Sequence, residues 1–162
     1  MTRYLIDANC LIEAKNRWYG FDICPAFWQW IENQNEAGVI YSIDKIKTEL
    51  VAGRDELAQW AQAKGQGFFL PTDNDVAVAY TQIVAWAQTA NFKPQAIQDF
   101  MGVADGWLVA HAMVHQFTVV THEKLDINQT TRIKIPRICN QHAIDCIDLF
   151  ELLRQTQARF VL

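Results

Sequence analysis

Short apolar segments alternate with amphipathic helical segments along all 162 residues, and this alternation limits the possible folds more than any other feature. The apolar segments are rich in β-branched and aromatic residues, which is typical of parallel strands buried on both faces. The pattern therefore predicts an α/β fold with a mainly parallel sheet. We expect strands at Tyr4–Ile6, Val39–Tyr41, Phe68–Leu70, Thr118–Thr121 and Ala143–Cys146.

Helix start and stop signals lie between these segments. Ser42 is typical of an N-cap for a helix that ends near Gly53. Thr72 and Asp75 have the spacing of a capping box. Further helices are expected after Pro25, at Glu56–Ala63 with Asp55 as its cap, after Pro94, at Ala104–His115 and at Asp148–Gln155.

Length and composition favour one globular domain over residues 1–162. No apolar run approaches the roughly 18 residues of a membrane span. Because the first strand follows Met1-Thr2-Arg3 directly, we expect no signal peptide and a cytoplasmic protein. The four cysteines form no Cys-x-x-Cys pair, which favours reduced thiols over a zinc site.

Four acidic residues follow or flank the expected strands at one edge of the sheet. Asp7 ends the first strand, and Glu123 follows the fourth. The carboxyl ends of parallel strands meet at one edge, where ligands of open α/β sheets bind. Asp105 lies in the first turn of the helix that leads into the fourth strand, and Glu49 lies about two turns into the helix after the second.

Carboxylates gathered in this way repel one another, so we expect a cation to hold them together. Oxygen ligands of this type suit Mg²⁺ or Mn²⁺. The formal charge of the chain is -4, and these four side chains account for all of it. A negative chain is thus compatible with a nucleic-acid substrate if the charge is concentrated at a metal site.

Each acid also has an ordinary structural explanation. Asp7 is in position to cap a helix that begins near Asn9, and Asp105 is favourable at a helix N-terminus because of the helix dipole. Glu49 is compatible with a solvated helix residue, and Glu123 with a turn residue. One shared cause accounts for all four more simply, and Asp126 is an alternative to Glu123 as the fourth acid.

At these positions the sequence resembles a PIN domain, and more closely the bacterial PIN-like family known as domain of unknown function 4411 (DUF4411). The resemblance covers most of the chain in order. Its segments are Tyr4–Asn9, Lys47–Leu50, Ala104–Ala110 and Val119–Glu123.

The resemblance implies a three-layer Rossmann-like fold with strand order 3-2-1-4-5, a Mg²⁺ or Mn²⁺ cluster, and endoribonuclease activity. It also implies a toxin of a bacterial toxin–antitoxin pair, with an antitoxin partner and a homodimer. Carried over by position, the catalytic and metal-binding residues are Asp7, Glu49, Asp105 and Glu123, and the small polar residues that orient them are Asn9 and Thr121.

Two features depart from the family pattern. Glu123 stands where many PIN domains have Asp, and the segment Lys15–Gly20 is longer than a minimal PIN toxin requires. Both leave the arrangement of the metal ligands open.

Substrate contacts are expected from Lys45, one turn before Glu49, from Lys124, and from Trp18. Trp18 lies in an expected loop, where an indole ring can stack on an unpaired RNA base. Most of the other possible phosphate contacts are interpreted as solvated surface charges; these are Lys15, Arg17, Lys47, Arg54, Lys93, Arg132 and Lys134.

Two other classes of protein compete with the nuclease. One is a catalytically inactive PIN-like module that acts by binding RNA or protein. The other is a phosphotransfer domain with Asp7 as nucleophile. This class is disfavoured because Asn9 occupies the position where such a domain has a second acid.

Overall fold

A computed structural model describes residues 1–162, and its centre is a five-stranded parallel sheet with strand order β3-β2-β1-β4-β5. Every neighbouring pair is parallel. The α/β class and the strand order expected from the sequence and from the PIN resemblance are thus confirmed. The strands are β1 (Tyr4–Ile6), β2 (Ile40–Ile43), β3 (Phe69–Leu70), β4 (Thr118–Val120) and β5 (Cys146–Ile147).

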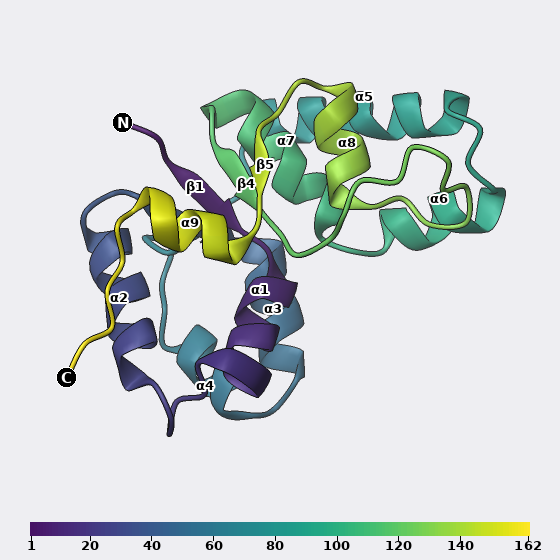
Figure 1. Ribbon diagram of the computed structural model, residues 1–162. Helices are drawn as coiled ribbons and strands as arrows, with labels where there is room; N and C mark the ends of the chain where they lie inside the picture. Colours follow the sequence, from purple (N-terminus) through teal and green to yellow (C-terminus); the bar gives the residue numbers. More distant parts are fainter.

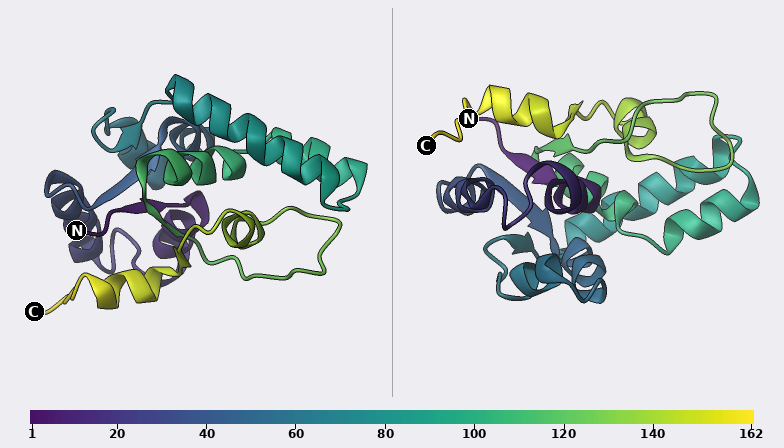
Figure 2. Two further views of the ribbon diagram at one scale, coloured as in Figure 1. Left: turned by 90° about the horizontal axis from the view of Figure 1, so that it is seen from above. Right: turned by 60° about the horizontal axis from the view of Figure 1, so that its bottom comes forward.

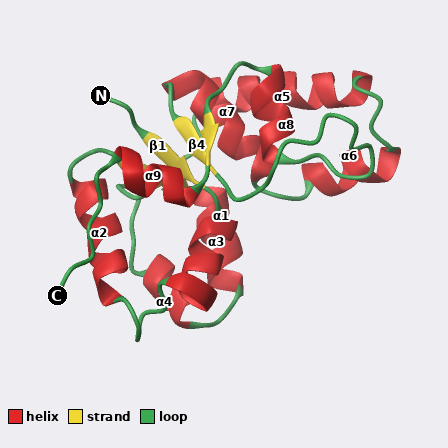
Figure 3. Cartoon of the chain, in the orientation of Figure 1, coloured by secondary structure: helices red, strands yellow, loops and turns green.

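Helices make up most of the chain and form the outer layers (Figures 1 and 3). Seen from above, α5 and α7 lie on one side of the sheet and α9 lies on the other (Figure 2). The helices are α1 (Ala8–Glu13), the π-helical turn η1 (Ala14–Trp18), α2 (Pro25–Glu36), α3 (Asp44–Ala52), α4 (Glu56–Gln62), α5 (Asn74–Thr89), α6 (Pro94–Met101), α7 (Asp105–His115), α8 (Ile135–Gln141) and α9 (Leu149–Gln155).

The central strands lie in one continuous hydrophobic core. Leu5 and Ile6 of β1 and Val119 and Val120 of β4 are fully buried, as expected for strands covered on both faces. The register pairs Leu5 with Val119 and Ile6 with Val120. This pairing places the carboxyl ends of β1 and β4 side by side. The residues that follow the two strands therefore lie at the same edge of the sheet.

The expected N-cap role of Ser42 is wrong. Ser42 is fully buried inside β2, where its hydroxyl donates a 2.8 Å hydrogen bond to the carbonyl of Ile6 on the neighbouring strand. Helix α3 begins two residues later, at Asp44. A buried hydroxyl needs a partner, and the adjacent strand supplies one.

The expected capping box at Thr72 and Asp75 is also wrong. Asp73 is the N-cap of α5 and accepts a 2.8 Å hydrogen bond from the Val76 N–H. Thr72 instead contacts Asp44, to which its own N–H donates at 3.1 Å. A neighbouring aspartate and a tertiary partner therefore override the sequence motif. The cap at Asp55 is confirmed, because its carboxylate accepts from the Ala58 N–H at 2.9 Å.

Several element bounds differ from expectation. The second strand runs to Ile43 and the last begins only at Cys146. The expected loop at Lys15–Gly20 is wrong for its first four residues, since η1 continues the chain helically to Trp18. Helix α8 has no counterpart among the expected helices.

All four cysteines are free thiols, as expected. None of the helices combines the length and the hydropathy that crossing a bilayer requires.

Candidate active site

The four acidic side chains singled out in the sequence line one cavity of about 310 Å³. Asp7 follows β1, Glu123 follows β4, Asp105 begins α7 and Glu49 comes from the last part of α3. Apolar residues of α1, α6 and the following turn also line it, among them Ile12, Phe100 and Val103. The other polar lining residues are Asn9, Asp99, Thr131 and Arg132. The fold therefore brings acids from four distant parts of the chain to the carboxyl edge of the sheet.

Asp7 is the most deeply buried of the four, with 5% of its surface exposed. It occupies the N-cap position of α1, but its side chain caps no helical N–H. The Thr121 hydroxyl donates to it at 2.9 Å instead. Burial, followed by the charge of Asp105, raises the pKa of Asp7 to about 8, although the Thr121 hydrogen bond opposes the shift.

Asp105 is half-buried at the start of α7 and has no side-chain hydrogen bond. Burial raises its pKa to about 7, and the charges of Glu123 and Glu49 add to the shift, while Arg132 opposes it. Desolvation and neighbouring negative charge both favour a neutral carboxyl. The acids therefore act on one another electrostatically, as one cluster.

Glu49 and Glu123 each hold the start of a helix through the backbone. Glu49 accepts a 3.0 Å hydrogen bond from the Ala104 N–H, immediately before Asp105. Glu123 accepts one of 3.2 Å from the Ile135 N–H at the start of α8, and Arg132 lies 3.5 Å from its other oxygen.

The cluster fits a hard divalent cation in donor chemistry and charge. All four ligand candidates are carboxylates, and burial followed by neighbouring negative charge raises the pKa values of Asp7 and Asp105. No three His, Cys, Asp or Glu side chains are spaced as a ready-made chelate. Two of the four carboxylates, those of Glu49 and Glu123, accept hydrogen bonds from backbone N–H groups.

Asn9 and Thr121 tie the two strand ends together beside the cluster. The Asn9 amide donates to the Thr121 hydroxyl at 3.3 Å, and the same hydroxyl accepts from the Glu123 N–H at 3.2 Å. Thr121 thus connects Asp7 to the segment that carries Glu123.

The other expected site residues lie at different places. Lys45 lies over the Trp107 ring at 4.4 Å and lines neither the acidic cavity nor the larger cavity next to it. Lys124 and Trp18 line a second, larger cavity next to the first. Asp126 is exposed and accepts from the Asn128 N–H in its own turn, outside the acidic cavity.

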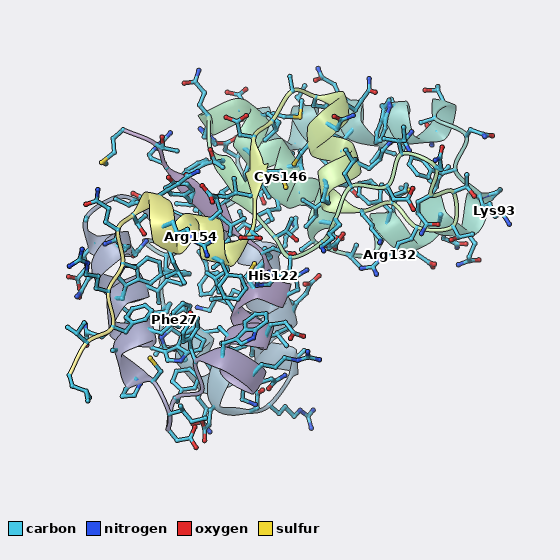
Figure 4. All side chains as sticks on the ribbon, in the orientation of Figure 1. Phe27, Lys93, His122, Arg132, Cys146 and Arg154 are labelled. Atoms are coloured by element: carbon cyan, nitrogen blue, oxygen red, sulfur yellow. The ribbon has the colours of Figure 1, made fainter.

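Arg132, one of the possible phosphate contacts in the sequence, lines both cavities. It comes from the irregular segment between β4 and α8 (Figure 4). No periodicity marks such a residue in the sequence, and only the proximity of a carboxylate, which requires the fold, reveals it.

Comparison with known proteins gives a family and a fold. The chain matches the family described as Domain of unknown function (DUF4411) over residues 4–160. No curated protein matches it significantly. The crystal structure of FitAcB from Neisseria gonorrhoeae is similar, with 20% sequence identity, a TM-score of 0.54, and coverage of 89% of this chain and 96% of that one.

A second similar structure is VapBC2 from Rickettsia felis bound to a DNA fragment from their promoter. It has 15% sequence identity and a TM-score of 0.55, and the match covers 91% of this chain and 98% of that one. At such low identity the likeness shows the fold, which is PIN-like.

Proposed function

This chain belongs to the family described as Domain of unknown function (DUF4411), and we propose that it is a metal-dependent endoribonuclease that hydrolyses RNA phosphodiester bonds. The observation that carries the proposal is the convergence of Asp7, Glu49, Asp105 and Glu123 around one cavity. Buried acids with pKa values of about 8 and about 7 lower the stability of the folded protein near neutral pH. Acids of this kind are typical of functional sites, where such a cost is tolerated.

We assign the four carboxylates to a site for Mg²⁺ or Mn²⁺. Such an ion supplies Lewis acidity toward water and toward the scissile phosphate when it is bound. Asp7 and Asp105 would be available to hold it, because their carboxylates accept from no backbone donor outside their own segments, whereas Glu49 and Glu123 accept hydrogen bonds from the Ala104 and Ile135 N–H groups. Thr121 fixes the Asp7 carboxylate through its hydroxyl, and Arg132 provides positive charge where a phosphate enters.

Proton release should accompany ion binding. Near neutral pH the ion-free cluster retains protons on Asp7 and Asp105, because their pKa values are about 8 and about 7. Ligands must lose these protons to bind a cation. The apparent affinity for Mn²⁺ therefore rises with pH up to about pH 8.

The biological role that we propose is the toxin of a bacterial toxin–antitoxin pair. The PIN-like fold and the family resemblance support this role. By analogy with FitAcB and VapBC2, whose fold this chain shares, we propose a partner antitoxin for this chain. Induced expression should arrest growth, and Asp7→Asn should remove the arrest.

A cleavage assay tests the enzymatic proposal. Purified protein is incubated with single-stranded RNA in Mn²⁺, in EDTA, and as the Asp7→Asn variant. We expect cleavage only by the unaltered protein in Mn²⁺. Equal cleavage by the variant would identify a contaminant. Absence of cleavage by all preparations, together with RNA binding, would favour the inactive binding module.

A further inference from the structure

A cavity of about 990 Å³ adjoins the acidic one at the carboxyl ends of β4 and β5. The two cavities share Asn9, Glu123 and Arg132 in their walls. In Figure 4, His122 and Arg132 lie below Cys146, and all three residues line the larger cavity. A chain that passes the carboxylates on this side therefore enters the larger cavity next.

One wall of this cavity is aromatic. Trp18 lies edge-to-face with His122 and with Phe150, each at 5.0 Å between ring centroids. The three rings come from η1, from the segment after β4 and from α9. Trp18 remains 37% exposed, so its neighbours leave part of the indole open to a ligand.

The remaining wall offers polar groups without protein partners. Lys124, Asn140 and Asp145 are exposed, line the cavity, and make no side-chain hydrogen bond or ion pair. By contrast, Arg17 and Glu13 neutralise each other at 2.8 Å. The cavity thus combines an aromatic surface with free donors and acceptors, and such a combination suits a planar, polar-edged group.

We propose that this cavity binds one unpaired nucleobase of the RNA strand, next to the phosphodiester held at the carboxylates, with Trp18 as its stacking surface. The inference rests on the proposed nuclease function and adds to it a stacking site for one base beside the cleaved bond. Every base has a π-face, so stacking tolerates different sequences. A paired base in a duplex has its faces covered by stacked neighbours and cannot enter.

The test measures binding rather than cleavage. Fluorescein-labelled single-stranded RNA is titrated with the Asp7→Asn protein in Mn²⁺, and its anisotropy gives Kd. A set of oligonucleotides carries one abasic site at successive positions. We expect one position, adjacent to the bond that the unaltered protein cuts, to weaken binding about tenfold, as loss of one stacked base does.

Variants of Trp18 identify the surface. In the Asp7→Asn background, Trp18→Ala and Trp18→Leu should each weaken binding about tenfold, and Trp18→Phe should retain most of the affinity. The abasic oligonucleotide should then lose nothing further in Trp18→Leu, because the two changes remove the same contact. Melting temperatures check that each variant is folded.

The outcomes separate the two claims. If Trp18→Leu is folded and binds unchanged, or if no abasic position matters, the nucleobase site is wrong while cleavage by the unaltered protein still supports the nuclease. If duplex RNA binds as tightly as single-stranded RNA, the site is also wrong. If the unaltered protein neither binds nor cleaves RNA, both claims are wrong. The abasic oligonucleotides are tested on a protein whose cavity residues are unaltered. If Trp18→Ala fails to fold, this series therefore still tests the site.

Discussion

Asp7 is a buried acid that receives one hydroxyl hydrogen bond and faces other negative charges. Asp7→Asn keeps the size of the side chain and removes the charge. In EDTA at pH 8 we expect the variant to be more stable than the unaltered protein by on the order of a few kcal/mol, since one pKa unit corresponds to about 1.4 kcal/mol. Thermal unfolding measures the difference.

The matched control is Asp126→Asn. This residue is also acidic and close to the site in sequence, but it is exposed and lies outside the acidic cavity. Its replacement should leave both the melting temperature and Mn²⁺-dependent cleavage within error. A loss of cleavage in Asp126→Asn would make Asp126 the fourth acid in place of Glu123.

Thr121 connects three polar partners through one hydroxyl, and it is buried. Thr121→Val preserves its shape and leaves these partners unsatisfied. We expect a loss of about 1–3 kcal/mol in the free energy of unfolding and weaker cleavage. Chemical denaturation measures the first effect.

Thr118→Val, at the start of the strand that Thr121 follows, serves as the control, because Thr118 makes no side-chain hydrogen bond. It should change stability by less than about 0.5 kcal/mol. Similar losses in the two variants would mean that the hydroxyl of Thr121 has no special role.

At the scale of elements, Asp105 is positioned by the close packing of α7 against α5 and α6. A Cβ at Gly106 would lie 2.5 Å from Phe100 Cζ and 3.0 Å from Tyr80 Cε2. Gly106→Ala should therefore destabilise the protein by about 1–3 kcal/mol, as overpacking does. Because Asp105 is the preceding residue, the cleavage activity of the Gly106→Ala protein should fall as well.

Gly65→Ala is the comparison, since no atom lies within 4 Å of the added Cβ. Thermal unfolding should find it within about 0.5 kcal/mol of the unaltered protein. If Gly106→Ala is equally mild, the close approach of α7 to its neighbours is not needed at this point.

The elements also show how far sequence patterns reach. Buried strands are recognisable because both faces are apolar, so β1 is predicted to the residue. The roles of Ser42 and Thr72 are mispredicted because their partners, Ile6 and Asp44, lie far away in sequence. Helix α8 is short, so the sequence contains no extended amphipathic pattern that would reveal it. Its Pro136 lies within the first turn.

The acidic residues, too, are predictable from the sequence only in part. Their order and their places after strands are visible in the sequence, and the strand order brings them to one cavity. Their individual environments are not visible. The backbone partners of Glu49 and Glu123, the position of Arg132 and the larger cavity all depend on contacts between distant segments.

At the scale of the whole molecule, stability should depend on pH through the acidic cluster. Asp7 and Asp105 have pKa values of about 8 and about 7 in the folded protein, above the ordinary 3.8. Between pH 3.8 and about pH 8 the folded state binds more protons than the unfolded state, so the free energy of unfolding falls as pH rises. Burial lowers the pKa of His111 to about 4, an opposite effect that ends near pH 6.5.

The informative window is therefore pH 6.5 to 8, where the two acids change charge and His111 does not. In EDTA the melting temperature should decrease across this window, and the decrease should be smaller in Asp7→Asn. Saturating Mn²⁺ should raise the melting temperature more at pH 8 than at pH 6.5, because the ion binds the ionised cluster. A melting temperature that rises with pH in EDTA would contradict the assigned shifts.

The central claim is that four carboxylates from distant segments share a divalent cation. A crystal soaked in Mn²⁺ tests it directly through anomalous scattering. The account predicts an anomalous peak between the carboxylates of Asp7 and Asp105, within ligand distance of both. Manganese bound elsewhere, with no peak between Asp7 and Asp105, would contradict it.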